Sequence, residues 1–273
     1  SPDVAYFRPA VYGFLDAGFC AGVSVDSGQD WLVSLSFCLR KRASISHQES
    51  ERMFQLLEEN YSSVSREIFY EDLGSKDFVG LLMDHANIIQ GFTTIALRTR
   101  HPDYNVLFSG DTIITPKHWG SQELVRGFCN AAGSFLATST KPLYWFLISK
   151  GHRTYLYLPL FTRKFFPDPN SQNEDLAAIA KTESMLMFPQ YYDQEKGLLV
   201  FPESRGELRP ELIAATLFRE TNAYIRFFRE RNPGFVRGNE LVCITELSPS
   251  NLKGIAKRWL VRGMSSNVIQ AAV

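Results

Sequence analysis

The most regular pattern near the start of the chain is an alternation of apolar and small polar residues over 31–39, which predicts a β-strand. Ser46 and Glu49 follow, three positions apart and ahead of apolar residues at helical spacing. That spacing is typical of a capping box, in which each side chain accepts a hydrogen bond from the other residue's backbone N–H. A second helix is predicted over 64–73. The first quarter of the chain therefore predicts one strand followed by two helices.

Antiparallel strands are predicted next. Apolar runs over 78–83 and 88–98 flank turn residues at 84–87, which is typical of a hairpin. A further strand is predicted over 105–115, and Pro116 ends it because proline has no N–H to donate to a ladder. The order of elements to this point is a strand, two helices and then antiparallel strands.

Helices and strands alternate further along the chain. Apolar residues at helical spacing predict a helix over 122–136, and a buried strand over 143–149 is followed by a helix from 151. The pattern then loosens. The later predicted elements are helices over 175–187 and 210–229 and a strand over 240–247. This mixture of elements predicts the α/β class.

Charge and hydropathy exclude several classes of protein. Lys plus Arg and Asp plus Glu each number 29, so the formal net charge is zero and no overall field attracts nucleic acid. The longest apolar runs are far too short to span a bilayer, and no secretory signal pattern is present. We therefore expect a cytoplasmic protein with no nucleic-acid partner and no transmembrane segment. The basic stretch from Lys253 onward suits a solvated helix face, an acidic carrier protein or peripheral membrane contact.

Cysteine and aromatic content add two expectations. The four cysteines lie far apart, with no spacing typical of a metal site, so we expect no metal and a reducing compartment. Aromatic residues make up 13% of the chain, which indicates a thick core or a roomy apolar pocket.

Two stretches of the chain resemble one known family. Residues 89–97 (IQGFTTIAL) contain a Gly-aromatic pair of the kind common in the second hairpin strand of the GNAT superfamily of N-acyltransferases. Residues 110–120 (GDTIITPKHWG) resemble that family's fourth strand and the loop after it, where an acidic residue often stands five positions before a proline. Asp111 and Pro116 have this spacing. The predicted order of elements over about 46–167 matches the family as well.

The resemblance implies a GNAT-like α/β fold with a mixed, mostly antiparallel twisted sheet flanked by helices and a helical C-terminal extension. It divides the chain into an N-terminal arm and first strand (1–45), a GNAT-like acyltransferase core (46–167) and a helical extension whose late strand completes the core (168–273). It also implies an N-acyltransferase. Such an enzyme would move an acyl group, with a long chain as one alternative, from a thioester to the amine of a small molecule such as an amino acid.

One part of the family's pattern is missing. The family's loop usually carries glycines, and its backbone N–H groups cradle the pyrophosphate of coenzyme A at a helix N-terminus. Aligned on the proline, the corresponding positions hold Trp119, Gln122 and Leu124, and only Gly120 fits. Side chains here would crowd a pyrophosphate. The chain is similar in this respect to relatives that use an acyl carrier protein, such as N-acyl amino acid synthases. The carrier protein and coenzyme A therefore stay open as rival donors.

The expected co-substrate is thus an acyl-phosphopantetheine thioester, with no tightly bound cofactor. A helix N-terminus with basic side chains nearby suits a single phosphate. The residues expected to bind the phosphopantetheine group are Lys117, His118, Trp119, Gly120, Ser121, Gln122, Arg126 and Ser149.

Three side chains are candidates for the chemistry, which needs a neutral amine and a proton for the leaving thiolate. Asp111 is the first candidate base, because burial would raise its pKa; the alternative is a structural Asp closing the strand. His152 suits a base, a group that orients one, or a solvated His at a helix start. The helix predicted from 151 corresponds to a helix that, in the family, supplies a tyrosine to protonate the thiolate. Tyr155 is the candidate here, with Tyr157 close by, and both also suit a core.

A second function stays open beside the enzyme. The missing glycine cradle favours a non-catalytic protein, derived from an acyltransferase fold, that binds acyl chains or a partner.

Overall fold

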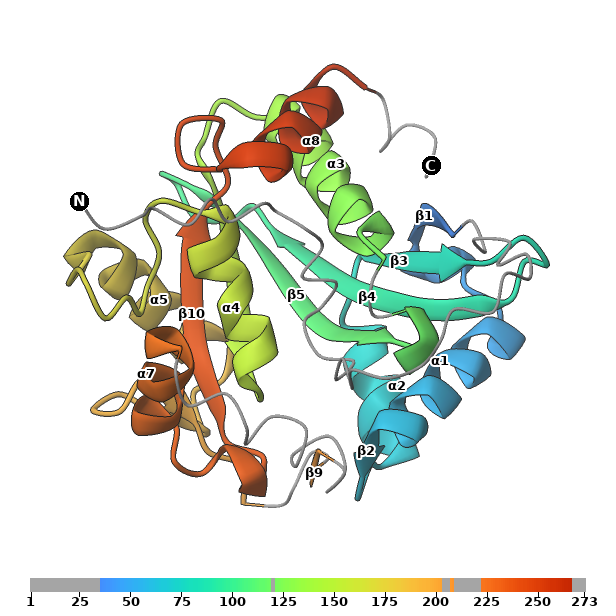
Figure 1. The fold of residues 1–273 in the computed structure, drawn as a ribbon, viewed down its shortest axis with the longest axis horizontal. Coiled ribbons are helices and arrows are strands. Elements are labelled where there is room, and N and C mark those ends of the chain that lie inside the picture. The colour runs from blue at the N-terminus through green and yellow to red at the C-terminus, as the bar shows by residue number, and fades with distance from the viewer. Residues whose placement is uncertain (1–34, 119–120, 203–206, 209–221, 267–273) are drawn as a thin grey trace, which may run out of the picture.

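The computed structural model describes residues 35–118, 121–202, 207–208 and 222–266, and these form a mixed α/β fold (Figure 1). One eight-stranded sheet has the order β1-β3-β4-β5-β6-β10-β8-β7. Within it only β5 and β6 pair in parallel, so the sheet is mostly antiparallel. The strands are β1 (Ser36–Lys41), β3 (Phe78–Met83), β4 (Ile89–Arg98), β5 (Asn105–Ile114), β6 (Leu143–Ser149), β7 (Tyr192–Asp193), β8 (Leu198–Leu199) and β10 (Glu240–Glu246). The expected α/β class, with a mixed and mostly antiparallel sheet flanked by helices, is confirmed.

Helices cover both faces of this sheet because its strands alternate apolar side chains between the two faces. On one face, the α1 face, Phe92 and Ile113 pack against helices α1 and α2. On the other, the α3 face, Ile95 and Leu107 pack against α3 and α8. Figure 1 shows α3 and α8 above β3, β4 and β5, with α1 and α2 below them. These helices are α1 (His47–Asn60), α2 (Arg66–Gly74), α3 (Glu123–Ala137) and α8 (Gly254–Met264).

Three further helices cover the second half of the sheet. Helix α5 (Glu174–Met187) packs on the α1 face, against β5, β6 and β10. Helices α4 (His152–Phe161) and α7 (Ala223–Arg231) pack together on the α3 face. A second, two-stranded sheet pairs β2 (Tyr61–Ser62) with β9 (Glu207–Leu208). Each face of the sheet is therefore covered by two groups of helices, which are α1 with α2 and α5 on the α1 face, and α3 with α8 and α4 with α7 on the α3 face. The central strands β5 and β6 lie where the two groups meet.

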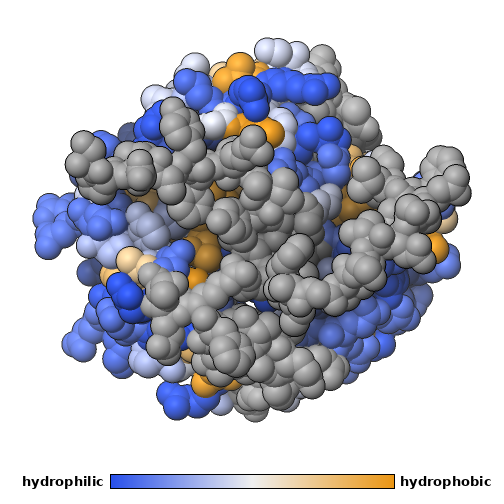
Figure 2. All heavy atoms as spheres, in the orientation of Figure 1, coloured by the Kyte–Doolittle hydropathy of each residue, from blue (hydrophilic) through white to orange (hydrophobic). Residues whose placement is uncertain are grey.

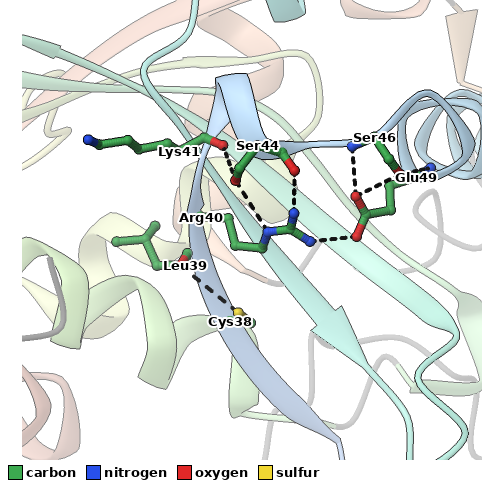
Figure 3. A network of polar contacts seen from close by, with 7 residues as sticks. All are labelled: Cys38, Leu39, Arg40, Lys41, Ser44, Ser46 and Glu49. Atoms are coloured by element: carbon green, nitrogen blue, oxygen red, sulfur yellow. Dashed lines mark hydrogen bonds and ion pairs between the residues drawn. The ribbon is translucent and has the colours of Figure 1, made fainter. Parts of the chain in front are cut away.

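The predicted capping box starts α1. Ser46 Oγ accepts a hydrogen bond from the backbone N–H of Glu49 at 3.2 Å, and Glu49 Oε2 accepts one from the backbone N–H of Ser46 at 2.8 Å (Figure 3). Arg40 Nη1 donates to Glu49 Oε1 at 2.6 Å. The same carboxylate therefore caps the helix and ties it to the preceding strand β1.

Helices α3 and α8 cross with their backbones almost in contact. A Cβ atom at Gly133 would lie 2.0 Å from the backbone O of Leu260, and one at Gly263 would lie 2.1 Å from the backbone O of Asn130. Ser134 Oγ also donates to the backbone O of Gly263 at 2.9 Å. Only glycine permits this approach, so the two glycines set the distance between the helices.

Two predicted elements differ from the structure. The strand predicted over 31–39 is observed as β1, and residues 31–34 lie outside the described part of the chain. The prediction of a single helix over 210–229 is wrong at Asn222. Residues 210–221 lie outside the described part of the chain. Asn222 has an extended backbone, and its side chain accepts hydrogen bonds from the backbone N–H groups of Tyr224 and Ile225. It is therefore an N-cap, and α7 begins after it.

The surface seen in Figure 2 is mainly hydrophilic where residues are coloured, with apolar residues in separate patches. Among the described residues, large apolar side chains that are exposed come from different elements, including Met185 and Leu186 of α5 and Val261 and Met264 of α8. Scattered apolar side chains of this kind are normal for a globular protein. None of the helices in the described ranges is long and apolar enough to cross a membrane.

Helix α5 is tied to the sheet by a buried carboxylate. Glu183 is 2% exposed and accepts hydrogen bonds from Arg98 Nε and from the Tyr104 hydroxyl, both at 3.1 Å. Burial, followed by the nearby Glu183, raises the pKa of Tyr104 to about 12, so its hydroxyl stays a donor. The carboxylate thus links α5 to β4 and to the residue just before β5.

Replacing Glu183 with Ala is expected to lower the free energy of unfolding by about 2 kcal/mol, because the buried Tyr104 hydroxyl loses its acceptor. Arg98 adds little to this cost, since its side chain is 40% exposed and can bind water. Urea denaturation measures the change. Glu195→Ala, at an exposed turn position, is the control and should stay within about 0.5 kcal/mol of the wild type. An equal loss in both variants would contradict the role given to Glu183.

Candidate active site

The two parallel strands at the centre of the sheet separate partway along. Strands β5 and β6 pair from Asn105 opposite Leu143 to Ser109 opposite Leu147, and their pairing ends there. Strand β5 continues to Ile114 beside β4, whereas β6 continues beside β10. In Figure 1, β5 and β10, which flank β6, diverge toward the lower half of the view. A gap therefore opens in the middle of the sheet just after Ser109.

A β-bulge lies on β5 where this gap begins. Thr93 pairs with Thr112 and Ile95 pairs with Ser109, so Gly110 and Asp111 together lie opposite one residue of β4. In a bulge the extra residue is left out of the ladder, which leaves a backbone group available for another partner. Gly110 packs closely, because a Cβ there would lie 2.5 Å from Thr94 Oγ1. The bulge thus places Asp111 at the edge of the gap.

A cavity of about 280 Å³ occupies this gap and extends between α2, β5 and the start of α4. We call it the charged cavity, because its lining includes several ionisable side chains. These are Asp72, Asp111, Lys150, His152, Arg153 and Glu240. Apolar walls surround them, contributed by α1, α2, β5 and the segments after α5, and include Leu57, Ile68, Phe69, Phe108, Phe188 and Phe201. The cavity therefore offers both charge and apolar surface to a ligand.

Asp111 is the carboxyl group in this cavity whose pKa is raised toward neutral pH. Burial, followed by the repulsion of Asp72, raises the pKa of Asp111 to about 6, and the ammonium groups of Lys150 and Lys76 limit the rise. A carboxyl group with a pKa near 6 is mostly ionised at neutral pH and holds a proton more strongly than an ordinary aspartate. It can therefore act as a general base.

Two lysines place positive charge beside Asp111. Lys76 has a side chain that is 1% exposed, and its Nζ lies 2.6 Å from Asp72 Oδ1. Lys150 Nζ lies 3.4 Å from Glu240 Oε1 and 5.2 Å from the centre of the Tyr61 ring. Burial alone would lower the pKa of Lys150, but Glu240, Tyr61 and Asp111 raise it. Lys150 therefore stays positively charged.

A second, smaller cavity of about 60 Å³ lies on the α3 face of the same gap, between α3, α4 and α8. We call it the apolar cavity, since Leu124, Phe128, Phe161 and Leu252 are among its lining residues. The two cavities share four lining residues, which are Ser109, Thr112, Trp145 and Tyr157. Together these residues form the partition between the two faces of the sheet.

The structure brings together two of the three predicted catalytic residues. Asp111 and His152 both line the charged cavity, with His152 at the first position of α4 and 3% exposed. Tyr155 does not reach it, because its side chain is fully buried and its hydroxyl donates to the backbone O of Pro167 at 2.9 Å. Tyr157 lines both cavities instead. Two residues advance a helix by about 200°, so the two tyrosines point to nearly opposite sides.

Tyr157 offers a protonated hydroxyl at the lining of both cavities. Burial raises the pKa of Tyr157 well above its usual value, and so its hydroxyl keeps its proton at neutral pH. Its ring stacks on Phe161 at a centroid distance of 6.0 Å, which orients it on α4. Tyr157 therefore replaces Tyr155 as the candidate proton donor.

The predicted phosphopantetheine residues lie away from the lining of both cavities in the part of the chain described. Lys117 and His118 form a single turn of 3-10 helix, and Ser121 and Gln122 precede α3. Ser149 is fully buried, with its Oγ 3.8 Å from Cys243 Sγ, so it does not face the gap. Trp119 and Gly120 lie outside the described residues. Binding of a phosphate by this segment stays a prediction.

The N-terminus of α3 carries a carboxylate that is paired with an arginine. Glu123 is the first residue of the helix, and the Arg126 guanidinium donates to its carboxylate. The backbone N–H of Glu123 donates to Ser121 Oγ at 3.2 Å. A carboxylate here is favoured by the helix dipole and competes with any other anion for the same position.

Sequence reasoning missed four ionisable members of the charged cavity, which are Asp72, Lys150, Arg153 and Glu240. Lys150 stands directly after the strand predicted over 143–149 and two positions before His152. Glu240 starts β10, and only the pairing of β10 with β6 brings it to Lys150. Asp72 reaches the cavity from the last turn of α2. The described residues contain no group of three or more His, Cys, Asp or Glu side chains able to hold a metal ion.

The strand order, the separation of β5 and β6 and the bulge at the gap define a mixed α/β fold with a candidate site at the centre of its sheet. No model of a protein family and no curated protein matches the chain. Among solved structures, the chain is similar to the Escherichia coli GNAT-family N-acetyltransferase YhbS in complex with CoA, with 14% identity and a TM-score of 0.35 over 48% of this chain and 70% of that one. It is also similar to E. coli ElaA, with 12% identity and a TM-score of 0.35 over 50% of this chain and 93% of that one.

A third structure with a similar arrangement is a conserved protein of unknown function from Enterococcus faecalis, described as a probable N-acyltransferase. The identity is 13% and the TM-score 0.35, over 48% of this chain and 33% of that one. All three similarities cover about half of this chain.

Proposed function

We propose that the protein transfers an acyl group from a phosphopantetheine thioester to the amine of a small molecule such as an amino acid. The observation that carries the proposal is the position of Asp111. It lies on a bulge where β5 and β6 separate, and its pKa is raised to about 6. It also lines a charged cavity that shares a partition with an apolar cavity on the other face.

The chemistry follows from the two cavities. The thioester arm enters through the apolar cavity, and the amine binds in the charged cavity beside Asp111. Asp111 takes a proton from the ammonium group, and the neutral nitrogen attacks the thioester carbonyl carbon. A C–N bond forms, the C–S bond breaks, and the leaving thiolate takes a proton from the Tyr157 hydroxyl. The attack leaves the nitrogen positively charged, and it loses a second proton, which restores the Tyr157 hydroxyl. Asp111 releases the first proton to solvent, so the net products are the amide, the thiol and one proton.

Charge develops on the carbonyl oxygen during the attack, and a backbone N–H aimed at it would stabilise the transition state. The bulge at Gly110 and Asp111 is suited to supply that donor, since its extra residue lies outside the ladder. Lys150 keeps a positive charge in the same cavity and limits the rise of the Asp111 pKa. These groups act by position and charge, with no metal required by the scheme.

For the donor, we favour an acyl carrier protein over coenzyme A. Support comes from the N-terminus of α3, where the Glu123 carboxylate already pairs with Arg126 and the Glu123 N–H is bonded to Ser121. Both features oppose a pyrophosphate, which carries more negative charge than the single phosphate of phosphopantetheine. Coenzyme A is the rival donor.

The test incubates the purified protein with acyl thioesters of each carrier and a broad pool of amino acids and amines, and follows free thiol and new amide by mass spectrometry. Amide from the carrier-protein thioester is the expected result. Amide from the coenzyme A thioester alone would keep the acyl transfer and overturn the choice of donor. Consumption of neither donor would overturn the enzyme in favour of a non-catalytic binder.

A further inference from the structure

We infer that Trp145 selects the acyl group by its width, admitting slender unbranched chains and excluding branched and aromatic ones. The inference rests on the proposed acyl transfer and assigns a specificity residue to it. It starts from the partition between the charged cavity and the apolar cavity. An acyl group that enters beside α3 must pass this partition to reach Asp111 on the other side.

Trp145 is the largest of the four side chains in the partition. Ser109 is small, and Thr112 is held by a 2.8 Å hydrogen bond between its Oγ1 and Thr93 Oγ1. Tyr157 is held on α4 by its stacking on Phe161. The indole of Trp145 therefore fills the largest part of the partition, and in this inference the space beside it is the passage between the two cavities.

The indole is fixed at the start of the gap by three contacts. Its Nε1 donates to Ser109 Oγ at 2.8 Å, which links β6 to the last residue of β5 that pairs with it. Its ring lies 5.0 Å from the ring of Phe128 on α3 and 6.5 Å from that of Tyr157 on α4. A side chain held on three sides keeps one rotamer, so the opening has a defined width.

A fixed opening discriminates by cross-section. Extending a linear acyl chain leaves its width unchanged, whereas a branch or a phenyl ring next to the carbonyl widens it at the point that must enter the gap. Truncating the indole to a methyl group removes the largest part of the partition. Overlap of even one methyl group with a well-packed wall is costly, because packed interiors yield little.

The experiment compares kcat/KM for butanoyl, octanoyl, 2-methylpropanoyl and benzoyl thioesters in the wild type, Trp145→Ala and Trp145→Phe. The wild type should prefer both linear chains over both wide groups. That preference should fall about tenfold or more in Trp145→Ala. This is the change in the ratio of kcat/KM values that one or two extra methylene groups on a substrate produce in a well-packed pocket. In Trp145→Phe, which keeps most of the bulk, the preference for linear chains should lie between those of the wild type and Trp145→Ala. Trp259→Ala is the control, since Trp259 packs in the same core cluster and lines neither cavity.

Binding is measured in parallel by calorimetry with S-butyl and S-benzyl phosphopantetheine thioethers, which cannot react. The Trp145→Ala variant should gain affinity for the benzyl compound relative to the butyl one, whether or not any variant turns over. Turnover with an unchanged preference in Trp145→Ala would overturn the inference and leave the acyl transfer standing. Binding of neither thioether by any variant would overturn both. If Trp145→Ala does not fold, Trp145→Leu takes its place in both measurements with the same expected direction.

Discussion

Replacing Asp111 with Asn is expected to reduce kcat/KM by about 100-fold to 10,000-fold, the usual contribution of a general base. Asn keeps the shape of the side chain and has no proton acceptor of comparable strength. The wild type should also lose activity as pH falls below about 6, because protonation of Asp111 removes the base. That acid limb should be absent from the residual activity of the variant.

The same substitution is expected to stabilise the fold at neutral pH. The folded protein retains the Asp111 proton up to about pH 6, whereas the unfolded chain releases it near the ordinary value of 3.8. Stability therefore falls as pH rises through this window, and ionised Asp111 costs the fold up to about 3 kcal/mol above it. Asn is neutral throughout, so the variant should be more stable than the wild type at pH 8 and about equal to it at pH 3.5.

Steady-state kinetics between pH 5 and pH 9 and urea denaturation at pH 3.5 and pH 8 measure the two effects. Asp103→Asn, at an exposed position outside both cavities, is the matched control and should change neither quantity. Near-normal turnover of Asp111→Asn would remove Asp111 from the mechanism. Loss of stability at pH 8 would instead assign it a structural role at the end of the bulge.

Replacing Gly133 with Ala is expected to lower the free energy of unfolding by about 3 kcal/mol or more. The added Cβ would lie 2.0 Å from the backbone O of Leu260 and 2.8 Å from the backbone N of Met264. Overpacking commonly costs about 1 to 3 kcal/mol when side chains can adjust, and here backbone atoms would have to move. The helices α3 and α8 would separate, which disturbs the wall of the apolar cavity formed by Leu124, Phe128 and Ala256.

Urea denaturation measures this loss, and Gly74→Ala is the matched control. Gly74 is the last residue of α2, and a Cβ there would meet nothing within 4 Å. The control should be neutral or slightly stabilising, because alanine restricts the unfolded chain more than glycine does. A loss below about 1 kcal/mol for Gly133→Ala would show that the two helices tolerate a wider separation.

Local patterns in the sequence were enough to predict most central elements. The capping box at Ser46, the strand at 78–83 and the strand at 143–149 are found where expected, because each depends on neighbours within one element. Asn222 lies within a predicted helix and is an N-cap in the structure, because its capping role competes with apolar periodicity. The fold class follows from the order of these elements.

The candidate site was only partly predictable, for two physical reasons. The choice between Tyr155 and Tyr157 depends on the rotation of α4 about its axis, which a short aromatic-rich helix does not encode clearly. The pair formed by Lys150 and Glu240 depends on a strand pairing between distant parts of the chain. Neither the helix rotation nor the pairing leaves a local sequence signal.

The late position of β10 also has a consequence for how the protein is made. The charged cavity takes Glu240 from this strand, and β10 pairs with β6 across a long stretch of intervening chain. Contacts between distant segments form slowly because a long loop must close first. During synthesis β3, β4 and β5 are available long before β10, so β6 remains an open edge until the C-terminal part of the chain leaves the ribosome. The cavity is completed among the last steps of folding.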